Sequence, residues 1–97
     1  MKRLRFSPTA LADLAAIHAY ISYDSPAAAK RVVRTIVGAM GRLKPFPHSG
    51  RKGRLDGTYE LVVPKLSFIV VYIVTRDAVE VIAIVHVARN GRSRDIK

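Results

Sequence analysis

The segment "TYELVVPKLSFIVVYIVTRDAVEVIAIVHV", residues 58–87, decides the fold of this chain. It contains three runs rich in β-branched residues, at 58–63, 67–74 and 79–87, which predict three β-strands. Only the short stretches "PKL" and "TRDA" separate the runs, and connections of this length join neighbouring antiparallel strands. We therefore expect a meander of three strands.

The last of these strands is apolar on both faces. Side chains alternate across a strand, which predicts one face with Val79, Val81, Ala83, Val85 and Val87 and another with Glu80, Ile82, Ile84 and His86. One layer of helices can shield only one face of a sheet. We expect the second face to bind a protein partner, because an exposed apolar face on a small protein usually marks a binding surface.

The N-terminal half predicts one short strand and two helices. Residues 2–6, "KRLRF", alternate cationic and apolar side chains, as a strand does. Helices are predicted to begin after Ser7 and Ser25, because serine is a good N-cap and a proline, favoured in the first helical turn, follows each one. Since only "YDSP" connects the helices, they should form an antiparallel hairpin.

Glycines and prolines complete the pattern. Gly38 and Gly41 weaken the second helix, so we expect them to allow the close approach of a neighbouring backbone. The segment 44–57, "KPFPHSGRKGRLDG", predicts a loop. The chain is therefore predicted to be a single α+β domain over residues 1–97, in the order β-α-α-β-β-β. In it the helical hairpin packs on one face of a small, mainly antiparallel sheet.

The charge balance predicts a polyanionic partner. The chain has 97 residues, with 17 Lys and Arg against 7 Asp and Glu, a formal net charge of +10. Such an excess favours a nucleic acid, a ribonucleoprotein, an acidic protein or an anionic membrane as partner. The absence of cysteine excludes disulfides and thiolate metal sites. His18 and His48 have no further metal ligands at suitable spacing, so we expect neither a metal nor a cofactor.

No membrane segment is predicted. Pro8 and Asp13 interrupt the basic N-terminal stretch where a signal peptide would need an apolar run, and Pro64 and Lys65 interrupt the most apolar region, 61–74. We therefore expect a cytoplasmic protein with no membrane partner.

The predicted element order, the segment 57–61 ("GTYEL") and the strand end 84–86 ("IVH") together resemble the RelE/ParE toxin superfamily. Its members are the toxins of bacterial type II toxin–antitoxin modules, often called plasmid stabilisation proteins. The resemblance implies a growth inhibitor that forms a hetero-oligomer with an acidic cognate antitoxin.

The superfamily includes two activities. ParE-like members poison DNA gyrase, whereas RelE-like members cut mRNA on the ribosome without a metal. RelE-like nucleases carry lysines where this chain has Glu60 and Val62 and an arginine where it has Ile69, although Arg89 matches a basic position. Because RNA cleavage needs cations around the phosphate, the resemblance favours a gyrase inhibitor that is not an enzyme. An mRNA endoribonuclease is the alternative, and a small nucleic-acid-binding module is a weaker one, since only Tyr59 and Tyr72 could stack bases from the sheet.

The candidate catalytic residues apply only to the nuclease alternative. His86 could transfer the proton, helped by Arg54 and Arg89, and Arg51 or Lys65 could lie nearby. The structural interpretation, a half-buried histidine on an apolar face, is favoured. Glu60 most simply forms an ion pair with a neighbouring arginine.

The candidate binding residues are basic or apolar. Those for the target or a phosphate are Arg51, Lys52, Arg54, Arg89, Arg92 and Arg94, with Gly50, Gly53 and Gly57 allowing a close approach of the backbone. In relatives that resemble ParE, the C-terminal portion is implicated in toxicity. A solvated loop and a charged terminus are the alternatives. Those for the antitoxin are Lys30, Arg31, Arg34, Ile82 and Ile84, and the three cations could instead form a solvated helix face.

Overall fold

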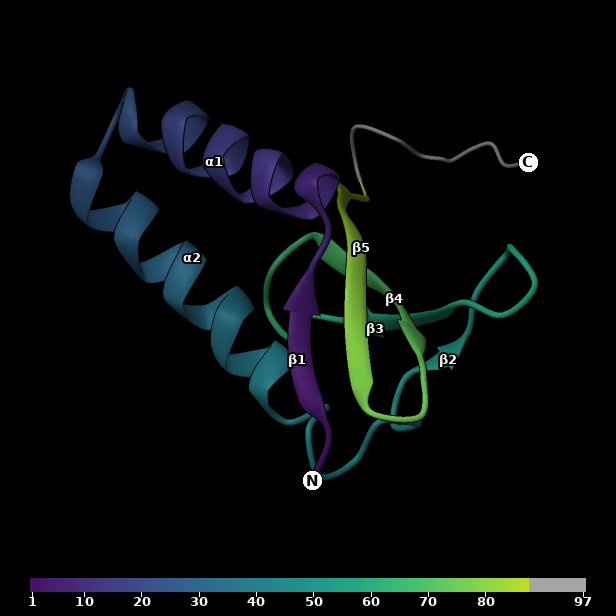
Figure 1. The fold of residues 1–97 in the computed structure, drawn as a ribbon. Coiled ribbons are helices and arrows are strands. Elements are labelled where there is room, and N and C mark those ends of the chain that lie inside the picture. The colour runs from purple at the N-terminus through teal and green to yellow at the C-terminus, as the bar shows by residue number, and fades with distance from the viewer. Residues whose placement is uncertain (88–97) are drawn as a thin grey trace.

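The computed structural model describes residues 1–87 as two helices against a five-stranded sheet (Figure 1). The elements are β1 (Arg3–Phe6), α1 (Pro8–Ser22), α2 (Pro26–Gly41), β2 (Arg51–Lys52), β3 (Tyr59–Val62), β4 (Phe68–Val74) and β5 (Ala78–His86). The strand order is β1-β5-β4-β3-β2; β1 pairs with β5 in parallel and the other neighbours are antiparallel. The predicted α+β fold is confirmed. The loop predicted over 44–57 also contains the two-residue strand β2, which is too short to produce a sequence pattern.

Both helices begin where the serines predict. The hydroxyl oxygen of Ser7 accepts a hydrogen bond from the backbone N–H of Ala10 at 3.0 Å, and that of Ser25 accepts one from Ala28 at 3.1 Å. Each serine thus satisfies an N–H group that the first helical turn leaves without a backbone partner.

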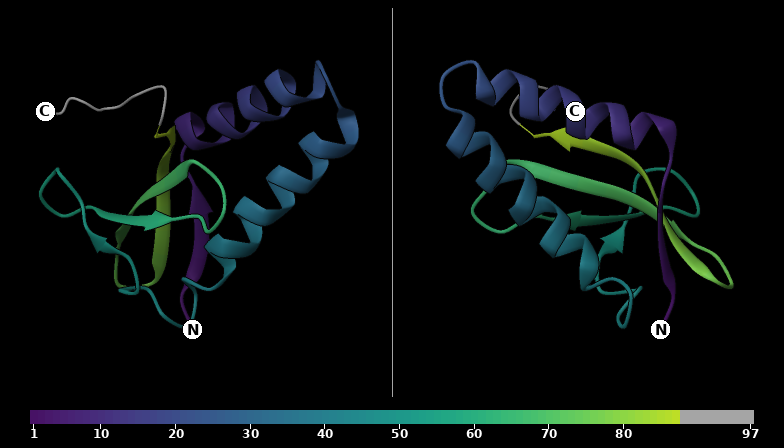
Figure 2. Two further views of the ribbon diagram at one scale, coloured as in Figure 1. Left: turned by 180° about the vertical axis from the view of Figure 1, so that it is seen from behind. Right: turned by 60° about the vertical axis from the view of Figure 1, so that its left-hand side comes forward.

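The helices lie together on one face of the sheet (Figure 2). The core between the two layers contains Ile36, Met40 and Leu43 from the end of α2 and the turn that follows it, all fully buried. They pack with buried residues of β4 and β5, among them Tyr72 and Val81. The opposite face, which we call the outer face, carries no helix among the described residues.

A β-bulge interrupts β5. Tyr72 pairs with Val81, whereas the preceding residue, Val71, pairs with Ala83, so Ile82 is an extra residue on β5. An inserted residue reverses the alternation of side chains beyond it. Ile84 therefore joins Val81 on the helix-covered face and is only 6% exposed.

The prediction that Ile82, Ile84 and His86 share one face is therefore wrong. Ile84 and His86 lie on the helix-covered side, where they pair with Val70 and Phe68 of β4. Ile82 lies on the outer face, as Ala83 does. Ser7 binds the bulge, because its N–H donates to the carbonyl of Val81 at 2.9 Å and its hydroxyl donates to the carbonyl of Ile82 at 3.1 Å.

The prediction for Gly38 and Gly41 is also wrong. A Cβ atom added at either position would meet no heavy atom within 4 Å. Within residues 1–87 no neighbouring backbone approaches these positions, and packing there does not explain why glycine occupies them.

Candidate partner-binding surfaces

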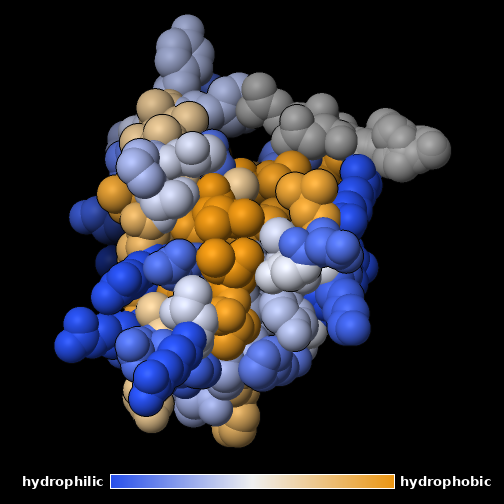
Figure 3. Space-filling model, turned by 45° about the vertical axis from the view of Figure 1, so that its right-hand side comes forward, coloured by the Kyte–Doolittle hydropathy of each residue, from blue (hydrophilic) through white to orange (hydrophobic). Residues whose placement is uncertain are grey.

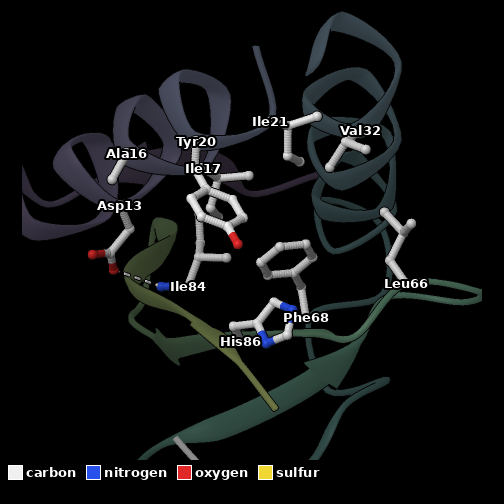
Figure 4. Close-up of a pocket in the computed structure, with 10 residues that line it drawn as sticks. All are labelled: Asp13, Ala16, Ile17, Tyr20, Ile21, Val32, Leu66, Phe68, Ile84 and His86. Atoms are coloured by element: carbon white, nitrogen blue, oxygen red, sulfur yellow. Dashed lines mark hydrogen bonds between the residues drawn. The ribbon is translucent and has the colours of Figure 1, made fainter. Parts of the chain in front are cut away.

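The helical hairpin and the sheet diverge and leave an apolar cavity of about 520 Å³ between them, which we call the wedge cavity (Figure 4). α1, α2, the β3–β4 turn, β4 and β5 all contribute to its wall. Its lining residues are Asp13, Ala16, Ile17, Tyr20, Ile21, Val32, Leu66, Phe68, Ile84 and His86. A space of this size and composition can accept several apolar side chains of a ligand or partner.

Asp13 joins α1 to β5 at one side of this cavity. β1 ends at Phe6, so β5 continues beyond its parallel partner. The carboxylate of Asp13 accepts a hydrogen bond from the backbone N–H of Ile84 at 2.9 Å (Figure 4). The side chain thus takes the place of a strand carbonyl and fixes α1 above the sheet.

His86 is part of the wall of the cavity. It is half-buried, and its ring meets that of Phe68 edge to face, with centroids 4.9 Å apart. The register of the sheet separates His86 from Arg51 by three strand spacings, about 14 Å. Moreover, Arg51 pairs with Glu60 of the outer face. The predicted neighbourhood of His86 and Arg51 is therefore wrong, whereas Lys65 lies in the turn at the same end of the sheet as His86.

α1 exposes an unusual surface for so basic a chain. It contains no Lys or Arg, and only Ala10 among its residues is fully buried. Leu11 is 53% exposed and Tyr20 is 68% exposed. Sequence analysis missed Asp13 and Tyr20 as site residues; the lack of cations over 8–22, in a chain with 17 of them, was the available signal.

The outer face of the sheet carries an aliphatic patch that we call the outer stripe: Val62, Ile69, Val71, Ala83 and Val85. Val62, Ile69 and Val85 form one row across β3, β4 and β5, and Val71 and Ala83 form the next row. Val62 is 49% exposed and the other four are half-buried. Figure 3 shows this side of the molecule, with an apolar band between hydrophilic flanks. The described residues thus confirm the expected second apolar face, although the bulge changes its composition.

An ion pair stands on each side of the outer stripe. Arg5 of β1 lies 3.7 Å from Glu80 of β5, and Arg51 of β2 lies 3.2 Å from Glu60 of β3. Both arginines are largely exposed, and both carboxylates belong to strands that also contribute to the stripe. The predicted ion pair of Glu60 is confirmed.

Glu60 and Tyr72 hold the basic loop that contains Arg51, Lys52 and Arg54. The second carboxylate oxygen of Glu60 accepts from the backbone N–H of Arg54 at 3.4 Å. The hydroxyl of Tyr72 accepts from the backbone N–H of Gly50 at 3.0 Å. Burial raises the pKa of the Tyr72 phenol above its ordinary value, an effect that the hydrogen bond from Gly50 partly opposes. The basic side chains are therefore exposed on a loop whose backbone is fixed.

The glycines of this loop have a packing role. A Cβ atom at Gly50 would lie 2.7 Å from the carbonyl oxygen of Glu60, and one at Gly53 would overlap the hydroxyl of Thr58. Gly57 adopts a positive φ of 83°, which favours glycine. These contacts account for all three glycines without a bound phosphate.

The remaining candidate residues are dispersed. Lys30, Arg31 and Arg34 are exposed on α2, with Lys30 and Arg34 one turn apart on the side away from Val32. Arg89, Arg92 and Arg94 lie outside the described residues. Within residues 1–87, no three His, Asp or Glu side chains are grouped as a metal site would require. In the same range, no helix has both the length and the apolar character needed to cross a membrane.

Comparison with known proteins identifies the family. Residues 4–91 match the family described as the ParE toxin of the type II toxin–antitoxin system parDE. The chain belongs to the ParE toxin family. It is thus the toxin of a type II toxin–antitoxin system, and its predicted place in the RelE/ParE superfamily is confirmed.

Individual relatives agree with this assignment. The chain is 44% identical to the protein Y4kP of Sinorhizobium fredii over 85 residues, which is 88% of each chain. It is 36% identical to Toxin RelE2 of Caulobacter vibrioides over 80 residues, which is 82% of this chain and 89% of the relative. A structure titled as the chromosomal ParDE system of P. aeruginosa shares the fold with a TM-score of 0.79, at 24% identity, covering 89% of this chain and 96% of the other. A toxin of this family has an antitoxin as partner.

Proposed function

We propose that this ParE-family toxin stops growth by inhibiting DNA gyrase and that it does not cleave RNA. The observation that carries the proposal is the aliphatic outer stripe. Val62 and Ile69 lie side by side in the stripe, and Glu60 lies in the adjoining row. These are the three positions at which the resemblance to RelE-like nucleases would require cations.

The chemistry of RNA cleavage supports the same proposal. Attack by a 2′-hydroxyl builds negative charge on the phosphate, and fixed cations must stabilise that charge. Valine and isoleucine cannot do so, and a carboxylate at Glu60 would repel the phosphate. His86, the candidate proton-transfer group, faces the helices, whereas Arg51 belongs to the outer face.

The wedge cavity is our candidate for the antitoxin site. Its wall is mainly aliphatic and aromatic, and the adjoining surface of α1 has no cation that would have to be neutralised. An amphipathic antitoxin segment could insert apolar side chains into the cavity, where Ile84 lies. Acidic residues that flank the inserted segment would have to continue around α2 to reach the exposed Lys30, Arg31 and Arg34, since Lys30 and Arg34 lie on the side away from Val32. Ile82, on the outer face, is left out of this site.

Ribosome-dependent mRNA cleavage is the second candidate. Two observations favour it: one relative is named Toxin RelE2, and His86 stands half-buried at the end of a strand. In this case Lys65, at the same end of the sheet, and Arg89, which lies outside the described residues, would have to supply the cations for His86.

The test is to induce the chain without an antitoxin in growing bacteria and to analyse DNA and RNA from the same culture. Gyrase inhibition predicts cleaved DNA and an SOS response with intact mRNA, and loss of supercoiling by purified gyrase. RNA cleavage predicts new mRNA 5′ ends at codons of the ribosomal A site, and their loss in His86→Ala. Intact DNA together with such 5′ ends would refute the proposed function in favour of the second candidate.

A further inference from the structure

The two apolar surfaces of this toxin lie on opposite faces of one sheet. The wedge cavity takes Phe68 and Ile84 from β4 and β5, whereas the outer stripe takes Ile69 and Val85 from the same two strands. Because neighbouring residues of a strand point to opposite sides, the two surfaces share backbone but no side chain. A polypeptide seated in the wedge cavity therefore leaves the outer stripe accessible.

The charges around the outer stripe define the partner. Arg3 and Arg5 lie along β1, and Arg51 lies on β2; all three are exposed. The carboxylates of Glu60 and Glu80 neutralise only part of this charge, and the whole chain has a formal net charge of +10. A surface that fits this face has an apolar centre and acidic residues on both sides.

Other occupants fit less well. A second copy of this chain would bring the same cationic margins against these arginines and would be repelled. A nucleic acid would place its phosphates or bases over the centre of the face, where the stripe has neither a cation nor an aromatic ring for stacking. Tyr59 and Tyr72 point to the helix-covered side, stacked with centroids 5.6 Å apart.

We propose that the outer stripe is the surface with which the toxin binds its cellular target, through an acidic protein surface with an apolar centre, and that it is separate from the antitoxin site. This inference uses the proposed function for the identity of the target, gyrase, and for the placement of the antitoxin in the wedge cavity. The position of the target-binding surface is inferred only from the aliphatic side chains and the flanking arginines on the outer face of the sheet.

The test uses substitutions that change polarity but keep shape. Val62→Thr and Val71→Thr retain a β-branched side chain, so the strands keep their preferred conformation. Val37→Thr is the matched control, because Val37 lies on α2 with 41% exposure against 49% for Val62. All three full-length variants are compared with the wild type for melting temperature, growth arrest on induction, and inhibition of supercoiling by purified gyrase.

The expected result is a selective loss of action on the target. Each stripe substitution should weaken gyrase inhibition about tenfold, since burying one apolar side chain at an interface is typically worth a factor of this size. The double variant should no longer arrest growth, while Val37→Thr should act like the wild type. Inhibition should also weaken as salt is raised from low to physiological concentration, because the margins of the stripe are charged.

Each of the other possible outcomes contradicts either the role of the outer stripe, the kind of partner or the proposed function. If the folded stripe variants arrest growth as strongly as the wild type, the inference is wrong. If the wild type arrests growth but leaves gyrase active, the proposed function fails, and growth arrest by the variants still decides the role of the stripe. If the stripe variants lose mRNA cleavage on purified ribosomes, the partner is a ribonucleoprotein and not an acidic protein. If trypsin cuts at Arg92 and Arg94 faster in the stripe variants than in the wild type, the chain's own C-terminal residues occupy the stripe, which also overturns the inference.

Discussion

Replacing Gly50 by alanine should destabilise this protein, although the same replacement at Gly38 should stabilise it. At Gly50 the new Cβ would lie 2.7 Å from the carbonyl oxygen of Glu60 and 2.7 Å from the hydroxyl of Tyr72. The first atom belongs to the backbone of β3 and the second to a fully buried ring, so neither can move easily. The loop must shift instead and lose the 3.0 Å hydrogen bond from Gly50 to Tyr72.

The magnitude follows from these contacts. Overpacking costs about 1–3 kcal/mol and the lost hydrogen bond about 1 kcal/mol, while the reduced freedom of the unfolded chain offsets about 0.5–1 kcal/mol. Gly50→Ala should therefore lower the free energy of unfolding by about 2 kcal/mol. Gly38 lies in α2, where a Cβ atom would meet none of the described residues, so Gly38→Ala should raise that free energy by about 1 kcal/mol.

Urea unfolding followed by far-ultraviolet circular dichroism measures both changes. The two variants should differ by about 3 kcal/mol at an unchanged m-value. In a domain of this size each 1 kcal/mol corresponds to about 4–8 °C in melting temperature. A Gly50→Ala protein as stable as the wild type would refute the idea that Tyr72 and Glu60 fix the basic loop.

Three further changes test other contacts. Because burial raises the pKa of Tyr72 above 10.0, its neutral form stabilises the fold fully below about pH 10 and this stability is lost at higher pH, as the unfolded chain ionises first. Thermal unfolding between pH 8 and 11 should therefore show a shallower alkaline decline for Tyr72→Phe than for the wild type; equal slopes would contradict this. Asp13→Ala should lower the free energy of unfolding by about 1–3 kcal/mol, since it leaves the N–H of Ile84 without its acceptor, and Asp13→Asn should cost about half as much. Equal losses in urea unfolding would show that the hydrogen bond is unimportant. Lys65 has a positive φ of 67° at the β3–β4 turn, so Lys65→Gly should raise the melting temperature by a few degrees, corresponding to about 1 kcal/mol, and no increase would mean that this backbone is unstrained.

The sequence predicts those parts of the fold that depend on neighbouring residues. Ser7–Pro8 and Ser25–Pro26 mark both helix starts, because N-capping is a contact across three residues. The strands β3, β4 and β5 contain enough consecutive β-branched residues for the sequence to distinguish them from the turns between them.

Features that depend on distant residues escaped prediction. The bulge at Ile82 is bound by Ser7, which is 75 positions away in the chain and donates a hydrogen bond to the carbonyl of Ile82. The same bulge places Ile84 in the wedge cavity and so changes which side chains form each apolar surface. The hydrogen bond from Ile84 to Asp13 joins residues 71 positions apart, and no periodicity in the sequence indicates it. Glu60 was assigned correctly because its partner, Arg51, is only nine positions away.

The parallel pairing of β1 with β5 determines when the sheet can form during synthesis on the ribosome. Arg3 pairs with Ala78, so the first strand to be synthesised waits for the last. At ordinary translation speeds this delay is about 4–15 s, during which the position between β1 and β4 in the sheet is unfilled. A chain that ends before β5 therefore cannot form the wedge cavity or the outer stripe, because both take residues from β5. An antitoxin that is already in the cell during those seconds can therefore bind the toxin as soon as it folds.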